Sequence, residues 1–286
     1  MSESMTGSSI MIASQQANSL AGTASSKWTV RSPARTQHLL DLLYRLVERE
    51  MKLIYKRSIL GVAWTLIVPL MQLLAFTFMF HSVLGVHVSK YASYAFTGLL
   101  VWNWFQTSLI AATGCIIKSH SLLEQPGFPV SILPIVSVVT WLIHFAAALP
   151  VLLFFLCWDG AMLTPAILLM PLLLVLQAAF TLSLAYPLSA LNVPMRDTQH
   201  TLTVLLNLAI YVTPVFYTID KVPAKYQIVF QLNPMRHFLD AYRSILLHGQ
   251  APNWIPLTIV FALTCCLIPM GHWLFMRQSA RFVEDL

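Results

Sequence analysis

Long stretches without a single charged side chain alternate with short polar connections along most of this chain. Six of them lie within Ser58–Gly85, Tyr91–Ile117, Ile132–Trp158, Thr164–Leu191, His200–Ile219 and Asn253–Met276. A helix needs about 20 mostly apolar residues to cross the hydrocarbon core of a bilayer, and each stretch provides that length. The pattern predicts an all-α membrane protein with six transmembrane helices.

Prolines interrupt several of these stretches, at Pro69, Pro150, Pro171 and Pro214. Proline ends a helix in water, but neighbouring helices satisfy the freed backbone groups in a membrane bundle. We therefore expect kinks at these positions rather than helix ends.

Composition and charge narrow the class further. Hydrophobic residues make up 57% of the chain and charged residues only 10%, which is far from the average of soluble domains. The net charge of +6 comes from basic residues beside the spans, so it suits an anionic membrane surface rather than nucleic acid. The cysteines lie inside predicted spans and form no disulfide or zinc pattern: Cys115, Cys157, Cys265 and Cys266.

Basic residues also predict the orientation, because they are retained beside spans on the cytoplasmic side. Of the 17 Lys and Arg residues, eight precede the first span, and Arg277 and Arg281 follow the sixth. Both termini are therefore predicted to be cytoplasmic. The external connection Asp220–Pro252 departs from this rule, because it carries Lys221, Lys225, Arg236 and Arg243.

The chain before the first span divides into two parts. Residues 1–35 are predicted to be a disordered leader, since Met1–Ser26 is rich in Ser, Ala, Thr and Gln and has no basic residue. Thr36–Arg57 has apolar residues near helical spacing with basic residues between them, which predicts an amphipathic helix on the inner membrane surface. Such a helix could anchor the chain, dock a cytoplasmic partner or clamp a phosphorylated substrate. The remainder, residues 36–286, is predicted to be one transmembrane domain with spans over about 58–276 and a cytoplasmic tail at 277–286.

The spans contain little that suggests catalysis. Asp159 and Asp197 lie at span ends, where capping or solvation is expected, and no Asp, Glu, Lys or Arg lies in the middle of a span. His81, His144 and His272 have no metal-ligand spacing, so hydrogen-bonded packing is favoured and no catalytic or metal residue is predicted. None of the ten glycines precedes a lysine, which excludes a P-loop in this chain. ATP for active transport would have to be handled by another chain.

Aromatic residues gather at both ends of the second span and at the outer end of the fifth. They are Tyr91, Tyr94, Trp102, Trp104 and Phe105 in "YASYAFTGLLVWNWFQTS", and Phe216 and Tyr217 in "TPVFYTID". Such residues commonly form the interface belts of membrane proteins. Their flat faces also accept the apolar faces of sugar rings, so a polar glycan could slide past them.

Four stretches together resemble the permeases of polysaccharide-exporting ABC transporters. They are "REMKLIYKRS" (49–58), "FPVSILPIVSVVTWLIHF" (128–145), "LNVPMRD" (191–197), and "TPVFY" (213–217) followed by "LNPMRHFLDAYRSILLHG" (232–249). The similarity covers roughly residues 36–280 in the same order.

The resemblance implies a six-helix permease of the bacterial plasma membrane that forms a homodimer and binds two copies of a separate ATP-binding subunit. ATP and Mg would be bound by that partner and no cofactor by this chain. The cargo would be a lipid-linked glycan of the O-antigen, capsule or teichoic-acid kind, commonly on undecaprenyl pyrophosphate. The aromatic residues named above, without Tyr91, would contact the glycan, and Lys52, Lys56 and Arg57 would meet the pyrophosphate.

The resemblance also gives roles to two connections. Asn233–Gly249 has apolar residues near i, i+3, i+4 spacing with Arg236, Asp240 and Arg243 between them, and would be an amphipathic re-entrant helix of an outer gate. Lys118–Pro129 would be the coupling segment that contacts the ATPase, through Lys118, Leu122, Glu124 and Phe128. Here the chain departs from the family, because Val130 and Ser131 stand where an Arg-Glu pair is usual.

Three other functions stay open at this point. A related permease could carry lipids, drugs or small hydrophobic molecules. A membrane-bound glycan-modifying enzyme would need a catalytic group such as Asp159, Asp197 or His144. A purely anchoring role is disfavoured, because an anchor has little need of six spans.

Overall fold

The computed structural model describes residues 33–56, 60–79, 90–161, 164–219, 222–279 and 281–282. The chain divides into two compact units, Met1–Tyr44 and Arg45–Leu286. Every described element is a helix, as predicted. Residues 1–32 of the predicted leader lie outside the described residues, whereas residues 33–35 belong to helix α2 (Pro33–Tyr55).

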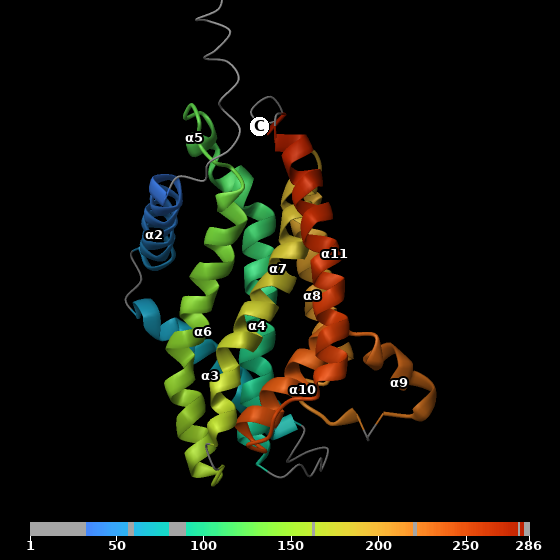
Figure 1. Cartoon of the computed structure of the whole chain (residues 1–286). Coiled ribbons are helices and arrows are strands. Elements are labelled where there is room, and N and C mark those ends of the chain that lie inside the picture. The colour runs from blue at the N-terminus through green and yellow to red at the C-terminus, as the bar shows by residue number, and fades with distance from the viewer. Residues whose placement is uncertain are drawn as a thin grey trace, which may run out of the picture. The chain divides into compact units, whose positions relative to one another are not determined.

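The second unit is built around helix α4 (Tyr91–Lys118), which lies in the centre of the bundle in Figure 1. It packs against α6 (Ile132–Trp158) and α7 (Met170–Asn192), and also against α3 (Trp64–Thr77) and α8 (Asp197–Val212). Helix α11 (Trp254–Ser279) packs along α7. Because of this central position, more side chains are buried on α4 than on any other described helix.

In the part of the chain that the structure describes, four helices are long and apolar enough to cross a membrane: α4, α6, α11 and the segment Pro165–Asn192, which joins a 3-10 helix to α7. They correspond to the predicted second, third, sixth and fourth spans. Many large apolar side chains on the outer surface of the bundle are exposed, as the lipid-facing side of a membrane protein requires. The chain is therefore an all-α, multi-pass membrane protein.

The predicted first and fifth spans contain shorter helices. In the first, Gly61 has a positive φ of 47° and begins a 3-10 turn, Gly61–Ala63, so α3 starts only at Trp64. Residues 57–59 and 80–89 of this region, with Arg57 and His81, lie outside the described residues. Helix α3 itself has 14 residues and α8 has 16, which correspond to about 21 and 24 Å.

Prolines explain one of these helix ends. Helix α8 stops at Val212, and Thr213 is extended with φ −98° and ψ 130°, because the residue before a proline avoids the helical conformation. The prediction that Pro214 only kinks the fifth span is therefore wrong. Pro69 and Pro150 lie inside continuous helices as expected, and Pro171 lies in the first turn of α7.

Short helices mark the two ends of this unit. Helix α10 (Pro234–Leu246) lies at the end where α4 begins and α6 ends, whereas α5 (His120–Leu123) and the C-terminal end of α11 lie at the opposite end (Figure 1). Helix α9 (Ala224–Gln231) precedes α10 at the same end.

Candidate functional site

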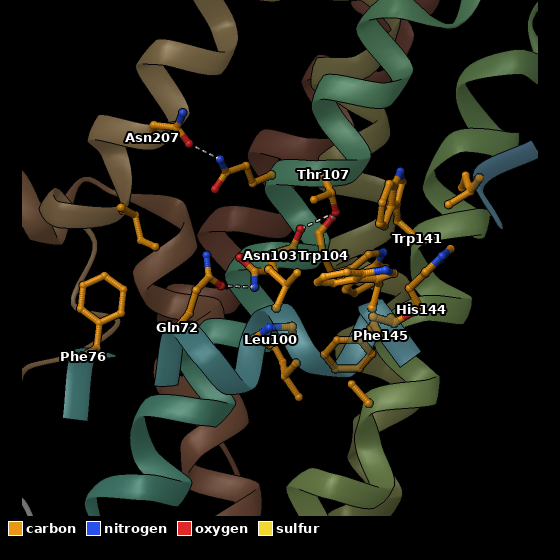
Figure 2. A pocket seen from close by; sticks show the side chains of 18 of the residues that line it. Gln72, Phe76, Leu100, Asn103, Trp104, Thr107, Trp141, His144, Phe145 and Asn207 are labelled. Carbon is orange, nitrogen blue, oxygen red and sulfur yellow. Dashed lines mark hydrogen bonds between the residues drawn. The ribbon is translucent and has the colours of Figure 1, made fainter. Parts of the chain in front are cut away.

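A cleft of about 560 Å³ opens between α3, α4, α6 and α8 (Figure 2). Ile54 and Tyr55 from the end of α2 also line it. The four helices come together here because α4 packs on all three of the others and α3 packs on α6. The cleft therefore lies against the most central helix of the bundle.

Amide side chains from three helices form a polar row in the cleft. Asn103 of α4 donates from Nδ2 to Oε1 of Gln72 on α3, at 3.2 Å, and Gln106 donates from Nε2 to Oδ1 of Asn207 on α8, at 2.7 Å. Trp102 donates from Nε1 to Oε1 of Gln106, at 2.6 Å, and so holds that amide in place. Figure 2 shows the Gln72–Asn103 pair and the amide of Asn207 pointing toward the same space.

Aromatic side chains form most of the remaining wall. Trp64, Trp104, Trp141 and Tyr211 line the cleft together with Tyr55. Trp104 donates weakly to the backbone oxygen of Val138, at 3.4 Å, and its ring lies 5.4 Å from that of Phe145. Both contacts orient an indole that would otherwise be free to rotate.

The chemistry of this lining is distinctive. Among the described residues, no lysine, arginine, aspartate or glutamate lines the cleft. Amides offer both donors and acceptors, and aromatic faces offer flat apolar surface. This combination suits uncharged molecules whose rings have hydroxyl groups around apolar C–H faces, as sugars do, and offers them no strong ionic contact.

The predicted aromatic contacts fall in different places. All three of Trp102, Trp104 and Phe105 are almost fully buried, but only Trp104 lines the cleft, whereas Trp102 and Phe105 lie on the side of α4 toward α7 and α8. Phe216 is also buried and its ring stacks on Phe76 at 3.7 Å, and Phe76 is a cleft residue. Cleft residues that sequence reasoning missed are Tyr55, Trp64, Trp141 and the four amides. A signal existed for two of them, because Asn103 and Gln106 are polar at i, i+3 spacing in an otherwise apolar span.

Tyr94, predicted as a glycan contact, lies against Arg243, which was predicted as a gate residue. Tyr94 donates from its hydroxyl to the backbone oxygen of Tyr217, at 2.9 Å. Arg243 is only 3% exposed, and its Nη atoms donate to the backbone oxygens of Pro214 and Val215, at 2.9 and 2.7 Å. This network ties α10 to α4 and to the chain that follows α8.

The other two predicted gate residues lie seven and three positions before Arg243, on the same stripe of α10. Arg236 and Asp240 form an i, i+4 ion pair at 3.3 Å, and the Asp240 side chain is half exposed. Asn233 caps the helix by accepting from the Met235 backbone N–H, at 3.0 Å, while its Nδ2 donates to Thr213 Oγ1, at 2.8 Å. Both ends of α10 are thus attached to the end of α8.

Basic residues cluster along the last turns of α2. Arg45, Arg49, Lys52 and Lys56 surround a shallow notch that also includes Glu48. Lys52 donates to Glu48 Oε1 at 2.6 Å, and this hydrogen bond lowers the pKa of the Glu48 carboxyl. Ile54 and Tyr55, in the same turns, line the cleft. No described residue lines both the cationic notch and the uncharged cleft, and Arg57 lies outside the described residues.

The predicted coupling residues lie around α5. Leu122 and Phe128 pack on a buried cluster that includes Leu123, Phe275 and Phe282. Lys118 and Glu124 are exposed. This segment is therefore held against the C-terminal end of α11 by apolar contacts and presents its charges outward.

Asp159 has a capping role, as the sequence predicted. Its Oδ2 accepts from the Ser93 hydroxyl, at 2.6 Å, and from the Ser93 backbone N–H, at 3.2 Å, which is one of the unsatisfied donors in the first turn of α4. No group of three or more His, Cys, Asp or Glu side chains in the described part of the chain could hold a metal ion.

Comparison with known proteins decides the family. The model of the ABC-2 type transporter family matches residues 41–247. The chain belongs to this family of membrane transport proteins. It is 32% identical over 247 residues to an O-antigen export system permease protein RfbA of Myxococcus xanthus, covering 86% of this chain and 95% of that protein. Two proteins of the same description from Klebsiella pneumoniae are 28% and 27% identical, each over 87% of this chain and 96% of the relative.

All of the cleft, the cationic notch, α5 and α10 lie inside the range that matches the ABC-2 transporter family. The elements singled out from their geometry are therefore part of the transport domain itself. This permease has its candidate site in the middle of that domain.

Proposed function

We propose that this protein is the permease subunit of an ATP-driven exporter that moves a lipid-linked polysaccharide outward across the bacterial plasma membrane. The observation that carries the proposal is the cleft, in which amides and indoles line the central helix without a charged side chain. The O-antigen export described for its relatives fits that lining. A lining of this kind lets a hydroxyl-rich chain exchange one set of weak contacts for the next.

The cationic notch fits the other end of such a substrate. A pyrophosphate carries concentrated negative charge, which paired cations at a water–lipid boundary attract. Lys52 lies in the last turn of α2 and Lys56 directly follows the helix, while Ile54 and Tyr55 between them line the cleft. The lipid-linked end would be held at the notch while the glycan enters the cleft.

The proposal includes six membrane crossings, with α3 and α8 as the two short ones and with both termini in the cytoplasm. The segment that follows α8 and helix α10 would then form the outer, re-entrant gate. Helix α5 would face the cytoplasm, where its exposed charges meet the ATP-binding subunit. Two copies of each chain would assemble, and ATP bound by the partner would shift the permease between states of different access.

Depletion of the protein in its native cell tests this function. Labelled sugar would be followed into lipid-linked polysaccharide, and internal material would be separated from surface-exposed material. The proposal predicts internal accumulation with loss from the surface. Unchanged surface polysaccharide, in a cell without a second exporter, would instead favour a lipid, a drug or another small hydrophobic cargo.

A further inference from the structure

His144 lies near the middle of α6 and faces the cleft, and the charge-free lining gives it unusual surroundings. It is only 6% exposed, and it lines the cleft beside Trp141 and Phe145 (Figure 2). Its ring centroid is 4.6 Å from that of Trp141 and 5.6 Å from that of Tyr55. The imidazole is thus enclosed between two aromatic residues from different helices.

One hydrogen bond determines which nitrogen of His144 carries the proton. Nδ1 lies 2.8 Å from the backbone oxygen of Thr140, and a carbonyl oxygen only accepts, so the hydrogen is on Nδ1. In the neutral ring Nε2 is then a bare acceptor. None of the described residues donates to Nε2, although the atom is buried. A buried acceptor without a donor is costly, so a hydroxyl supplied by a ligand would be favourable here.

A second polar group, the pair of hydroxyls on Tyr55 and Thr65, also lines the cleft. Tyr55 Oη and Thr65 Oγ1 lie 2.7 Å apart, and both residues line the cleft. Their two hydroxyl groups have two hydrogens, and this bond uses one of them. The pair can therefore donate the other hydrogen to a ligand oxygen, while His144 accepts from a ligand hydroxyl.

We propose that His144, Trp141 and Tyr55 form a subsite that holds a single sugar ring of the glycan in the cleft. The apolar face of the ring lies against the Trp141 indole, and one ring hydroxyl donates to Nε2 of His144. The subsite rests on the proposed function and adds to it a fixed contact that selects rings with a hydroxyl at the matching position. His144 acts here as a binding residue and takes no part in proton transfer.

Glycan binding to the full-length permease in lipid nanodiscs tests the subsite. The probe is short polysaccharide released by mild acid from the surface of the native cell, and tryptophan fluorescence reports binding. His144→Phe keeps an aromatic ring but removes the acceptor, and we expect a Kd about tenfold weaker. His144→Gln retains an acceptor and should recover part of the affinity. His272→Phe is the matched control, because His272 stands edge-on to Tyr186 and lies outside the cleft-lining set.

Measurements of thermal stability distinguish a binding role of His144 from a packing role. His144→Phe removes a buried unpartnered acceptor, so its thermal stability should equal or exceed that of the wild type while its glycan affinity falls. If His144→Phe does not accumulate, Trp141→Leu provides the same test by removing the indole surface, and it too should weaken the Kd. Equal affinity in wild type and in the accumulating variant would overturn the subsite.

The cell depletion experiment distinguishes this failure from failure of the proposed function. Export loss on depletion together with equal affinities would refute only the subsite at His144. Absence of glycan binding to the wild type would also overturn the subsite. If depletion in addition left surface polysaccharide unchanged, the proposed function itself would fail.

Discussion

The guanidinium carbon of Arg243 lies 3.5 Å from the centroid of the Tyr94 ring. The same side chain donates to the backbone oxygens that follow α8, so a buried cation is satisfied by carbonyl dipoles and an aromatic face. Among the described residues no carboxylate is paired with it. Movement of α10 therefore has to involve α4 and the end of α8 together.

Replacing Arg243 tests whether its contacts hold α10 to α4 and to the chain that follows α8. Arg243→Lys keeps the charge but loses the planar fork that reaches two carbonyls, so we expect about 2–4 kcal/mol of lost stability. Thermal unfolding of the purified permease in detergent would measure the change. Arg236→Lys, in the partly exposed ion pair on the same helix, should change stability by less than about 1 kcal/mol. Equal effects of both substitutions would contradict an anchoring role.

Gly98 leaves room for the Arg243 side chain against α4. A Cβ at this position would lie 2.5 Å from Nη2 of Arg243 and 3.0 Å from the backbone oxygen of Val215. Gly98→Ala should therefore destabilise the permease by about 1–3 kcal/mol, as overpacking does. In an Arg243→Met background the cost should be smaller, because the clashing atom is gone. Strictly additive effects in thermal unfolding would show that the two positions are independent.

Substitutions of Asp159 test whether its carboxylate has a structural or a catalytic role. Asp159→Ala removes the acceptor at the start of α4 and should cost about 1–2 kcal/mol in thermal stability, whereas Asp159→Asn should recover part of it. Polysaccharide export at a permissive temperature should persist in both variants, since the carboxylate only caps a helix. Complete loss of export from a folded Asp159→Asn protein would instead indicate a chemical role.

The cationic notch should matter for cargo rather than for insertion. Lys56→Glu places a negative charge beside the proposed pyrophosphate position, so export should fall several-fold and further than in Lys56→Ala. Labelling of introduced cysteines would verify the topology. Lys225→Glu, on α9 at the other end of the bundle, is the control and should leave export near the wild-type rate. An inverted topology would mean that Lys56 acts as an orientation signal.

The amide row should affect passage of long chains. Asn103→Leu removes the bond to Gln72 and one polar contact of the cleft, so export of long polysaccharide should slow while ATP hydrolysis continues. Gln231→Leu makes a similar change at an exposed position of α9 and should have no effect. Surface chain length on gels and ATPase rate in vesicles give the two readouts. Parallel loss of both would point to a folding defect.

Some features could be predicted from sequence because their signal is local. Charge-free stretches predicted the long helices, and the i, i+3, i+4 pattern of residues 233–249 predicted α10. The same pattern placed Arg243 among the polar positions, yet the side chain is buried. The hydrogen-bond acceptors of Arg243 are 28 and 29 residues away in the chain, so hydrophobic periodicity could not predict that this side chain is buried.

The cleft could not be predicted from the sequence for a related reason. The spans are apolar nearly all round, so periodicity does not show which side faces a neighbour and which faces a cavity. Trp102 and Trp104 are only two residues apart and both are buried, but only Trp104 lines the cleft. Only the packing of α3, α6 and α8 around α4 separates them.

Crosslinking inside the cleft tests the proposed glycan path most directly. A photoreactive phenylalanine analogue would replace Trp64, a half-exposed cleft residue, or Trp273, which is exposed on α11 outside the cleft-lining set. Irradiation during export of radiolabelled polysaccharide should attach label to the permease at position 64 and leave position 273 unlabelled. Equal labelling at both positions, or labelling at position 273 alone, would contradict passage of the glycan through this cleft.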